Sequence, residues 1–325
     1  MSGLATAAGR LRAAGSRRPV IAGFLLLALG LCAYALVRER DGVREALSHL
    51  TVPAVAEAFA GVLAALGAAL MQWRAVLADL GSRLAPRAAG RVFYLGQLGK
   101  YLPGSVWAAL GQMELAKAHA VPRSRSMTAY AVTMLTTLIA AFVAAAALLP
   151  FAAPAQFAAY RWFVLAVPLG VVALSPRVLN PTVNLLLRVM HRPPLDRPVS
   201  AKGIALASLW ALAGWVGYGL QIWALSCALG APPGRGLPVA VGGFALAWSV
   251  GFLVVFAPAG AGAREAVMAA ILSAVLPVAD ALIVVLVSRL LMTLGDLLTA
   301  GVAVAVTRRG PRGRPTAHAP GADAP

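Results

Sequence analysis

The chain has 325 residues, of which 60% are hydrophobic and only 12% are charged, and its mean hydropathy is +0.81. A composition this apolar excludes an average soluble globular protein and is typical of a polytopic helical membrane protein. The formal net charge of +17 would suggest nucleic-acid binding in a soluble protein, but here the arginines flank apolar stretches, as they do in cytoplasmic loops, and no nucleic-acid partner is expected.

The first 19 residues are basic and are expected to form a cytoplasmic N-terminus ahead of an apolar stretch at 20–37, which is long enough to span a bilayer. This stretch contains an Ala-Tyr-Ala sequence at 33–35, so a cleaved signal peptide is an alternative to an uncleaved first helix. In both cases the chain emerges on the outer side. There the segment 38–50 mixes charged and apolar residues and predicts an interfacial helix.

Further apolar stretches of spanning length follow at 54–76, 126–149, 161–176, 203–229 and 280–306. With the first helix they predict an all-α fold with six full crossings. Two other apolar regions, 92–116 and 237–277, are interrupted by proline and glycine. A broken helix in lipid survives only where protein or a water-filled cavity covers its backbone, so each region is expected to be a re-entrant hairpin. The transmembrane domain is therefore predicted over 20–306, followed by a disordered basic tail at 307–325.

The positive-inside rule assigns the loops to sides of the membrane. With the N-terminus inside, most of the 28 lysines and arginines fall on the cytoplasmic side, and the outer segments hold only Arg38, Arg40, Arg44, Arg161 and Arg235. The flanks of 92–116 are basic and those of 237–277 are poor in charge, so the two hairpins are expected to enter from opposite faces, as in an inverted repeat. The alternative, eight full crossings, would place the basic stretch 177–202 outside. Both termini are predicted to be cytoplasmic.

Trp73 and Trp162 lie near the ends of predicted spans and are interpreted as anchors at the membrane interface. The two cysteines lie in apolar segments and the four histidines are scattered, so we expect no disulfide, metal site or cofactor. The alanine- and arginine-rich composition suggests a bacterial protein of the cytoplasmic membrane.

Ionisable side chains inside hydrocarbon are costly and are functional candidates by default. In the predicted membrane segments these are Lys100, Glu114, Arg264, Glu265, Arg289 and Asp296. Arg289 and Asp296 lie two helical turns apart and share a face of the last span. Arg264 and Glu265 are adjacent and need separate partners, and the expected pairs are Arg264 with Asp296 and Arg289 with Glu265. Such pairs could also serve packing alone.

The two breaks predict an anion site. Where a helix restarts after a break, its free N–H groups and the positive end of its dipole lie near the middle of the membrane. With Lys100 and Arg264 close by, a phosphate group is the expected guest. The glycines could instead only permit close helix packing. The residues expected to join the charged groups in this site are Tyr101, Pro103 and Gly104 at the first break, and Pro258, Gly260 and Gly262 at the second.

At these positions the sequence resembles the transmembrane domain of the lysylphosphatidylglycerol synthase family, also called the flippase-like domain family. The matching pieces are the segment 95–107 and the sequence P-A-G-A-G-A-R-E at 258–265, which is similar to the family's P-x-G-x-G-x-R-E signature. In the bifunctional members such a domain moves an aminoacylated phospholipid between leaflets, and a soluble domain makes that lipid. The resemblance implies a stand-alone translocation module without the synthase, so aminoacyl transfer is not expected.

The residues and the resemblance together predict a lipid translocase that moves an anionic, aminoacylated or isoprenoid-linked lipid between leaflets. In this hypothesis Lys100 and Arg264 hold the lipid phosphate, while Glu114, Glu265 and Asp296 receive a cationic headgroup or relay protons. One alternative is a non-catalytic membrane partner of a cell-envelope or lipid-modifying synthase. Another is an integral-membrane lipid transferase with Glu114 or Glu265 as base, although no nucleophile, metal site or nucleotide-binding motif supports an enzyme. A second copy of the chain is a further partner left open.

Overall fold

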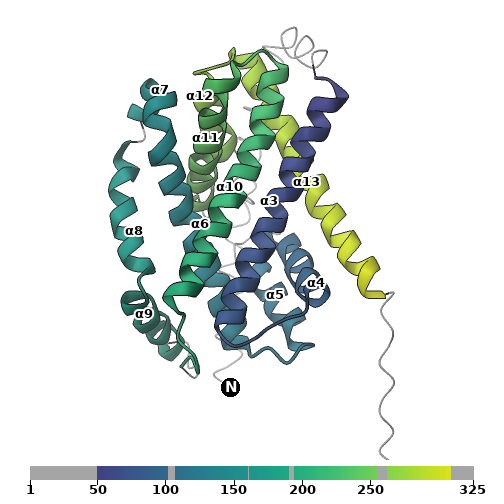
Figure 1. Ribbon diagram of the computed structural model, residues 1–325, viewed down its shortest axis with the longest axis vertical. Coiled ribbons are helices and arrows are strands. Elements are labelled where there is room, and N and C mark those ends of the chain that lie inside the picture. The colour runs from purple at the N-terminus through teal and green to yellow at the C-terminus, as the bar shows by residue number, and fades with distance from the viewer. Residues whose placement is uncertain (1–49, 102–106, 160, 190–193, 255–261, 309–325) are drawn as a thin grey trace, which may run out of the picture.

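A computed structural model describes residues 50–101, 107–159, 161–189, 194–254 and 262–308, and within these ranges every regular element is helical (Figure 1). The first predicted helix, nearly all of the predicted interfacial helix, the parts of the two breaks within 102–106 and 255–261, and the predicted tail from 309 onward lie outside the described residues.

Five of the described helices are long and apolar enough to cross a membrane, which confirms the predicted all-α polytopic fold. They are α3 (Val52–Asp79), α6 (Arg123–Ala152), α10 (Ala201–Ala228), α11 (Pro233–Leu253) and α13 (Val278–Arg308). Four of them match predicted spans. The fifth, α11, belongs to a region predicted as a re-entrant hairpin, but its 21 residues extend about 30 Å at 1.5 Å per residue, so this arm alone has the length of a crossing.

The predicted span at 161–176 is not one continuous helix. A short helix α7 (Pro154–Ala158) and a 3-10 turn (Arg161–Leu165) lead into α8 (Ala166–Leu174), which has nine residues and is followed by α9 (Pro176–Val189). Ser175 ends α8 with an extended ψ of 137°, as expected for a residue before proline. The prediction of an uninterrupted span here is wrong, although Figure 1 shows the segment running beside α6 toward the opposite end of the bundle.

Two helical hairpins lie between the long helices. In the first, α4 (Pro86–Gln97) continues into a 3-10 turn (Leu98–Tyr101) and packs against α5 (Trp107–Lys117). In the second, α11 packs against α12 (Ala263–Leu272). Figure 1 shows the first hairpin beginning and ending at the lower end of the bundle and the second at the upper end. This arrangement does not fit eight full crossings; insertion of each hairpin from its own side of a membrane stays a prediction.

The order of long helix, hairpin and long helix occurs twice. The first unit is α3, α4–α5 and α6, and the second is α10, α11–α12 and α13. α3 and α10 each have 28 residues and begin after a hydroxyl residue that caps the helix, Thr51 and Ser200. The two helices are antiparallel, because Asp79 accepts hydrogen bonds from Ser200 while Gly61 lies against Gln221. Two units of the same order and opposite direction form an inverted repeat.

The loops predicted to be cytoplasmic lie together at the lower end of the bundle, where side-chain hydrogen bonds connect them. Arg125 donates hydrogen bonds to Ser82 in the loop before α4 and to Asp196 in the segment before α10. At the opposite end, Arg235 donates to the backbone oxygen of Ala152. The basic segments around α4, α6, α9 and α10 therefore share one end of the protein.

Candidate functional site

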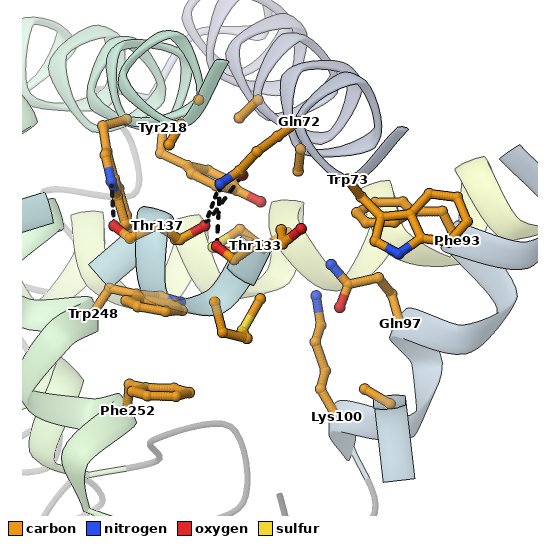
Figure 2. Close-up of a pocket in the computed structure, with 18 of the residues that line it drawn as sticks. Gln72, Trp73, Phe93, Gln97, Lys100, Thr133, Thr137, Tyr218, Trp248 and Phe252 are labelled. Atoms are coloured by element: carbon orange, nitrogen blue, oxygen red, sulfur yellow. Dashed lines mark hydrogen bonds between the residues drawn. The ribbon is translucent and has the colours of Figure 1, made fainter. Parts of the chain in front are cut away.

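A cavity of about 220 Å³ lies inside the bundle, where the two hairpins meet α13. Both repeat units line it, and Figure 2 shows how side chains of several helices converge on it. The polar and aromatic lining of the first unit comes from Gln72, Trp73, Phe93, Gln97, Lys100, Tyr101, Gln112, Tyr130, Thr133 and Thr137. That of the second unit comes from Trp210, Trp215, Tyr218, Trp248, Phe252, Arg264, Arg289 and Thr293.

Asp296 in the middle of α13 holds the end of the first hairpin. Its side chain is 3% exposed, and its Oδ2 lies 2.6 Å from the Nζ of Lys100 and accepts a hydrogen bond of 2.5 Å from the hydroxyl of Tyr101. A carboxylate this deep in an apolar bundle needs such partners to stay charged. The predicted pair of Asp296 with Arg264 is wrong, because the 3-10 turn after α4 brings Lys100 to the aspartate first.

Glu265 at the start of α12 joins the second hairpin to α13. Its Oε2 accepts a hydrogen bond of 2.6 Å from the backbone N–H of Gly262, whose φ of +89° favours glycine. Its Oε1 lies 3.0 Å from the Nε of Arg289, which confirms this predicted pair. The Nε–H is not aligned on Oε1 for a hydrogen bond, so the contact is an ion pair. The N–H of Gly262, predicted to face a phosphate, already has an acceptor.

Arg264 lines the cavity and is 8% exposed. Its guanidinium lies 4.5 Å from the ring centroid of Phe244, and Nη2 contacts the sulfur of Met292 at 2.9 Å. In the described part of the chain no carboxylate lies within ion-pair distance of it. The aromatic face offsets part of the cost of burying this charge, and an anion in the cavity would offset more.

Glu114 is not brought to the cavity. Its side chain is 64% exposed near the end of α5, where it pairs with Lys117 and approaches Arg123. The hydrogen bond from Lys117 lowers the pKa of Glu114, so this carboxylate stays ionised at the basic end of the protein. The expectation that it lies among buried groups is wrong, because α5 ends one turn later. The remaining predicted residues, Pro103, Gly104, Pro258 and Gly260, lie outside the described residues.

Sequence reasoning missed a neutral polar cluster on the side of the cavity formed by α3 and α6. The buried amide of Gln72 reaches the backbone oxygen of Thr133 at 3.1 Å and the hydroxyls of Thr136 and Thr137 at 2.8 and 3.0 Å (Figure 2). Thr137 donates back to Oε1 of Gln72 at 3.1 Å. A single glutamine in a long apolar helix barely changes the mean hydropathy of that helix. The only sign of this cluster in the sequence was an amide side chain inside a predicted span.

Trp73 has a different environment from the one predicted. It is fully buried, its ring packs on Phe93 with centroids 5.8 Å apart, and it lines the cavity. Its interpretation as an interface anchor is wrong, because α4 folds back over this end of α3 and covers the indole.

The comparisons with known proteins agree with this architecture. A family model described as the lysylphosphatidylglycerol synthase TM region matches residues 20–300, a range that holds both repeat units except the end of α13 and all five charged residues around the cavity. No curated protein gives a significant match. A match over most of the chain, on a multi-pass helical fold, settles its membership: the protein belongs to the family of the lysylphosphatidylglycerol synthase transmembrane region.

Proposed function

We propose that the protein is a lipid translocase that moves a phosphate-bearing lipid between the leaflets of the bacterial cytoplasmic membrane, with its basic end on the cytoplasmic side. Membership of the family supports a role in a lipid-related process. The observation that carries the proposal is Arg264, a buried cation that lines a cavity without a carboxylate partner among the described residues. A lipid phosphate would supply the missing negative charge.

The two ion pairs suggest how a lipid could pass. The Lys100–Asp296 pair connects the first hairpin to α13, and the Glu265–Arg289 pair connects the second. A phosphate that binds Lys100 or Arg289 competes with the carboxylate for the cation and loosens the corresponding hairpin. The two hairpins begin and end at opposite ends of the bundle. Loosening first one and then the other would therefore expose the cavity to one side of the membrane and then to the other, as in alternating access.

In this proposal the protein is not an enzyme. A general base has to reach a proton of the substrate. Glu265 is engaged by Gly262 and Arg289, and Glu114 lies at the basic end away from the cavity. Neither arrangement favours the transferase alternative. The sequence carries no nucleotide-binding motif, so transport would follow an ion gradient or the gradient of the lipid itself.

The test is a leaflet-resolved assay with the purified full chain in liposomes. It measures how fast fluorescent phosphatidylglycerol becomes accessible to a membrane-impermeant quencher. We expect protein-dependent movement that falls at least about tenfold in Arg264→Ala, since losing one charge-assisted hydrogen bond removes roughly 1.5–3 kcal/mol, and that is partly kept in Arg264→Lys. Arg83→Ala, which removes an exposed arginine outside the cavity, is the matched control.

Equal rates in wild type and Arg264→Ala, with both proteins folded by size-exclusion chromatography, would reject the site. No movement of phosphatidylglycerol, lysylphosphatidylglycerol or a polyprenyl phosphate would reject the translocase. The non-catalytic partner of a synthase would then be favoured, and co-purification with one membrane enzyme would support it.

A further inference from the structure

The charged side chains that line the described part of the cavity are all cationic. Lys100, Arg264 and Arg289 line it, whereas Asp296 and Glu265 lie behind two of these cations as their partners. Three cations against two carboxylates leave one positive charge, which suits the single negative charge of a phosphodiester. A cationic headgroup would meet this surplus with no carboxylate in the lining to receive it.

Three buried polar atoms of the lining have no hydrogen-bond partner among the described residues. They are Nε1 of Trp73, Oε1 of Gln112 and Oγ1 of Thr133, and their side chains are at most 3% exposed. Buried polar groups in folded proteins are nearly always paired, so each unpaired atom calls for an explanation. Together the three offer an N–H donor, a carbonyl acceptor and a hydroxyl that can act in both ways.

This neutral set is complementary to hydroxyl groups. A hydroxyl can accept from the indole and donate to the amide oxygen, whereas an ammonium group only donates and cannot pair with Trp73. Figure 2 shows the amide of Gln97 and the ammonium of Lys100 approaching the same part of the cavity, next to the Trp73 side. The cationic and the neutral groups can therefore contact adjacent parts of one ligand.

The cavity has room for a polar headgroup. Its volume of about 220 Å³ approaches that of small-ligand pockets, which begins at about 300 Å³. A phosphate with a small polar substituent fits such a space.

We propose that the cavity selects an anionic lipid whose headgroup is uncharged and carries hydroxyls, such as a glycerol or sugar phosphodiester, and that it discriminates against a cationic aminoacyl headgroup. This inference rests on the proposed translocase and names its substrate class. The phosphate contacts the cationic side, and the hydroxyls contact Trp73, Gln112 and Thr133.

The test compares four fluorescent lipids in the same proteoliposome assay: phosphatidylglycerol, phosphatidylinositol, lysylphosphatidylglycerol and phosphatidic acid. We expect the first two to move at least about tenfold faster than lysylphosphatidylglycerol. The decisive variant is the near-isosteric Thr133→Val. It should slow phosphatidylglycerol by about tenfold while leaving phosphatidic acid, which has no headgroup hydroxyl, unchanged. Thr182→Val removes an exposed hydroxyl of α9 outside the cavity and should change neither rate.

Stability gives a second readout that a structural role would not produce. Because Oγ1 of Thr133 has no hydrogen-bond partner in the described part of the chain, Thr133→Val should leave the melting temperature unchanged or raise it. Equal slowing of phosphatidylglycerol and phosphatidic acid by Thr133→Val would overturn the inference. So would lysylphosphatidylglycerol moving as fast as phosphatidylglycerol.

If no lipid moves, the proposed translocase is rejected, but headgroup selectivity can still be tested by binding. Unlabelled lipids then compete with fluorescent phosphatidylglycerol for the full chain in detergent. Equal competition by lysylphosphatidylglycerol would then reject the inference.

Discussion

Glu265 uses its two carboxylate oxygens for two different structural tasks. Oε2 caps the first turn of α12 through Gly262, and Oε1 pairs with Arg289 of α13. Both side chains of the ion pair keep some exposure, 22% for Glu265 and 29% for Arg289, so the attraction itself contributes only about 1 kcal/mol. Leaving either charge without its partner is more costly than losing the attraction.

Because an unpaired charge costs more than the lost attraction, the stability losses from substituting the two residues should not add. We expect Arg289→Gln to lower the free energy of unfolding by about 1–3 kcal/mol, because Glu265 keeps its charge and loses its cation. Glu265→Gln should cost less, since the amide oxygen can still accept from Gly262. The double variant should be more stable than the sum of the two losses predicts, by about 1 kcal/mol. Unfolding in detergent measures all three, and strictly additive losses would contradict the pair.

The residue scale also shows what sequence can and cannot determine about this site. The Glu265–Arg289 pair could be predicted because two adjacent charges on one helix need separate partners, and the last span offers few. The partner of Asp296 could not, because it depends on how far the turn after α4 carries Lys100 toward α13. Trp73 and Thr133 could not be predicted as cavity residues, since the role proposed for them rests on buried polar atoms without a hydrogen-bond partner among the described residues.

Among the elements, α3 and α10 are in close backbone contact where each has a glycine, Gly61 and Gly217. A Cβ on Gly61 would lie 2.8 Å from the backbone oxygen of Gly217 and 2.9 Å from the backbone nitrogen of Gln221. Real Cβ atoms do not come this close to backbone, so any side chain at Gly61 would push the two helices apart. Small residues at helix contacts are the usual way in which membrane helices pack tightly.

Gly67 in the same helix provides a matched control, because a Cβ there would meet no heavy atom within 4 Å. We expect Gly61→Ala to destabilise the protein by about 1–3 kcal/mol through overpacking. Gly67→Ala should stabilise it by about 0.5–1 kcal/mol, because alanine is the better helix former. Equilibrium unfolding of both variants in mixed micelles tests this, and equal effects of the two substitutions would contradict the close contact.

Elements that depend on long apolar runs could be predicted from sequence, and those that depend on local chain breaks could not. The predicted span at 54–76 lies within α3, and that at 203–229 exceeds α10 by only one residue, because apolar length dominates there. The stretch 161–176 is also apolar, but it begins as a 3-10 turn at Arg161–Leu165, and Pro176 forces an extended residue before it that ends α8. α11 reaches spanning length although Pro238 lies inside it and removes one backbone hydrogen bond.

At the scale of the whole molecule, α13 is the element on which both hairpins depend. It holds the first hairpin through Asp296 and the second through Arg289, one from each end of the bundle. Its counterpart in the first repeat unit, α6, contributes only neutral residues to the cavity. The two helices therefore differ in charge although they occupy equivalent positions in the repeat. The inverted repeat could be predicted from the charges flanking the hairpins, whereas this asymmetry could not.

The orientation of the bundle in the membrane gives the last prediction. The loop 118–122 lies at the basic end and the segment around α7 at the other, so the positive-inside rule puts His119 in the cytoplasm and Ala158 outside. Both residues are exposed. In a chain with both cysteines replaced, a membrane-impermeant maleimide on intact cells should label Ala158→Cys and should label His119→Cys only after permeabilisation. The reverse pattern would place the basic end of the bundle outside and contradict the proposed orientation. It would mean that the hairpins enter from the sides opposite to those proposed, and the cycle of loosening at Lys100 and Arg289 would then run in the opposite direction across the membrane.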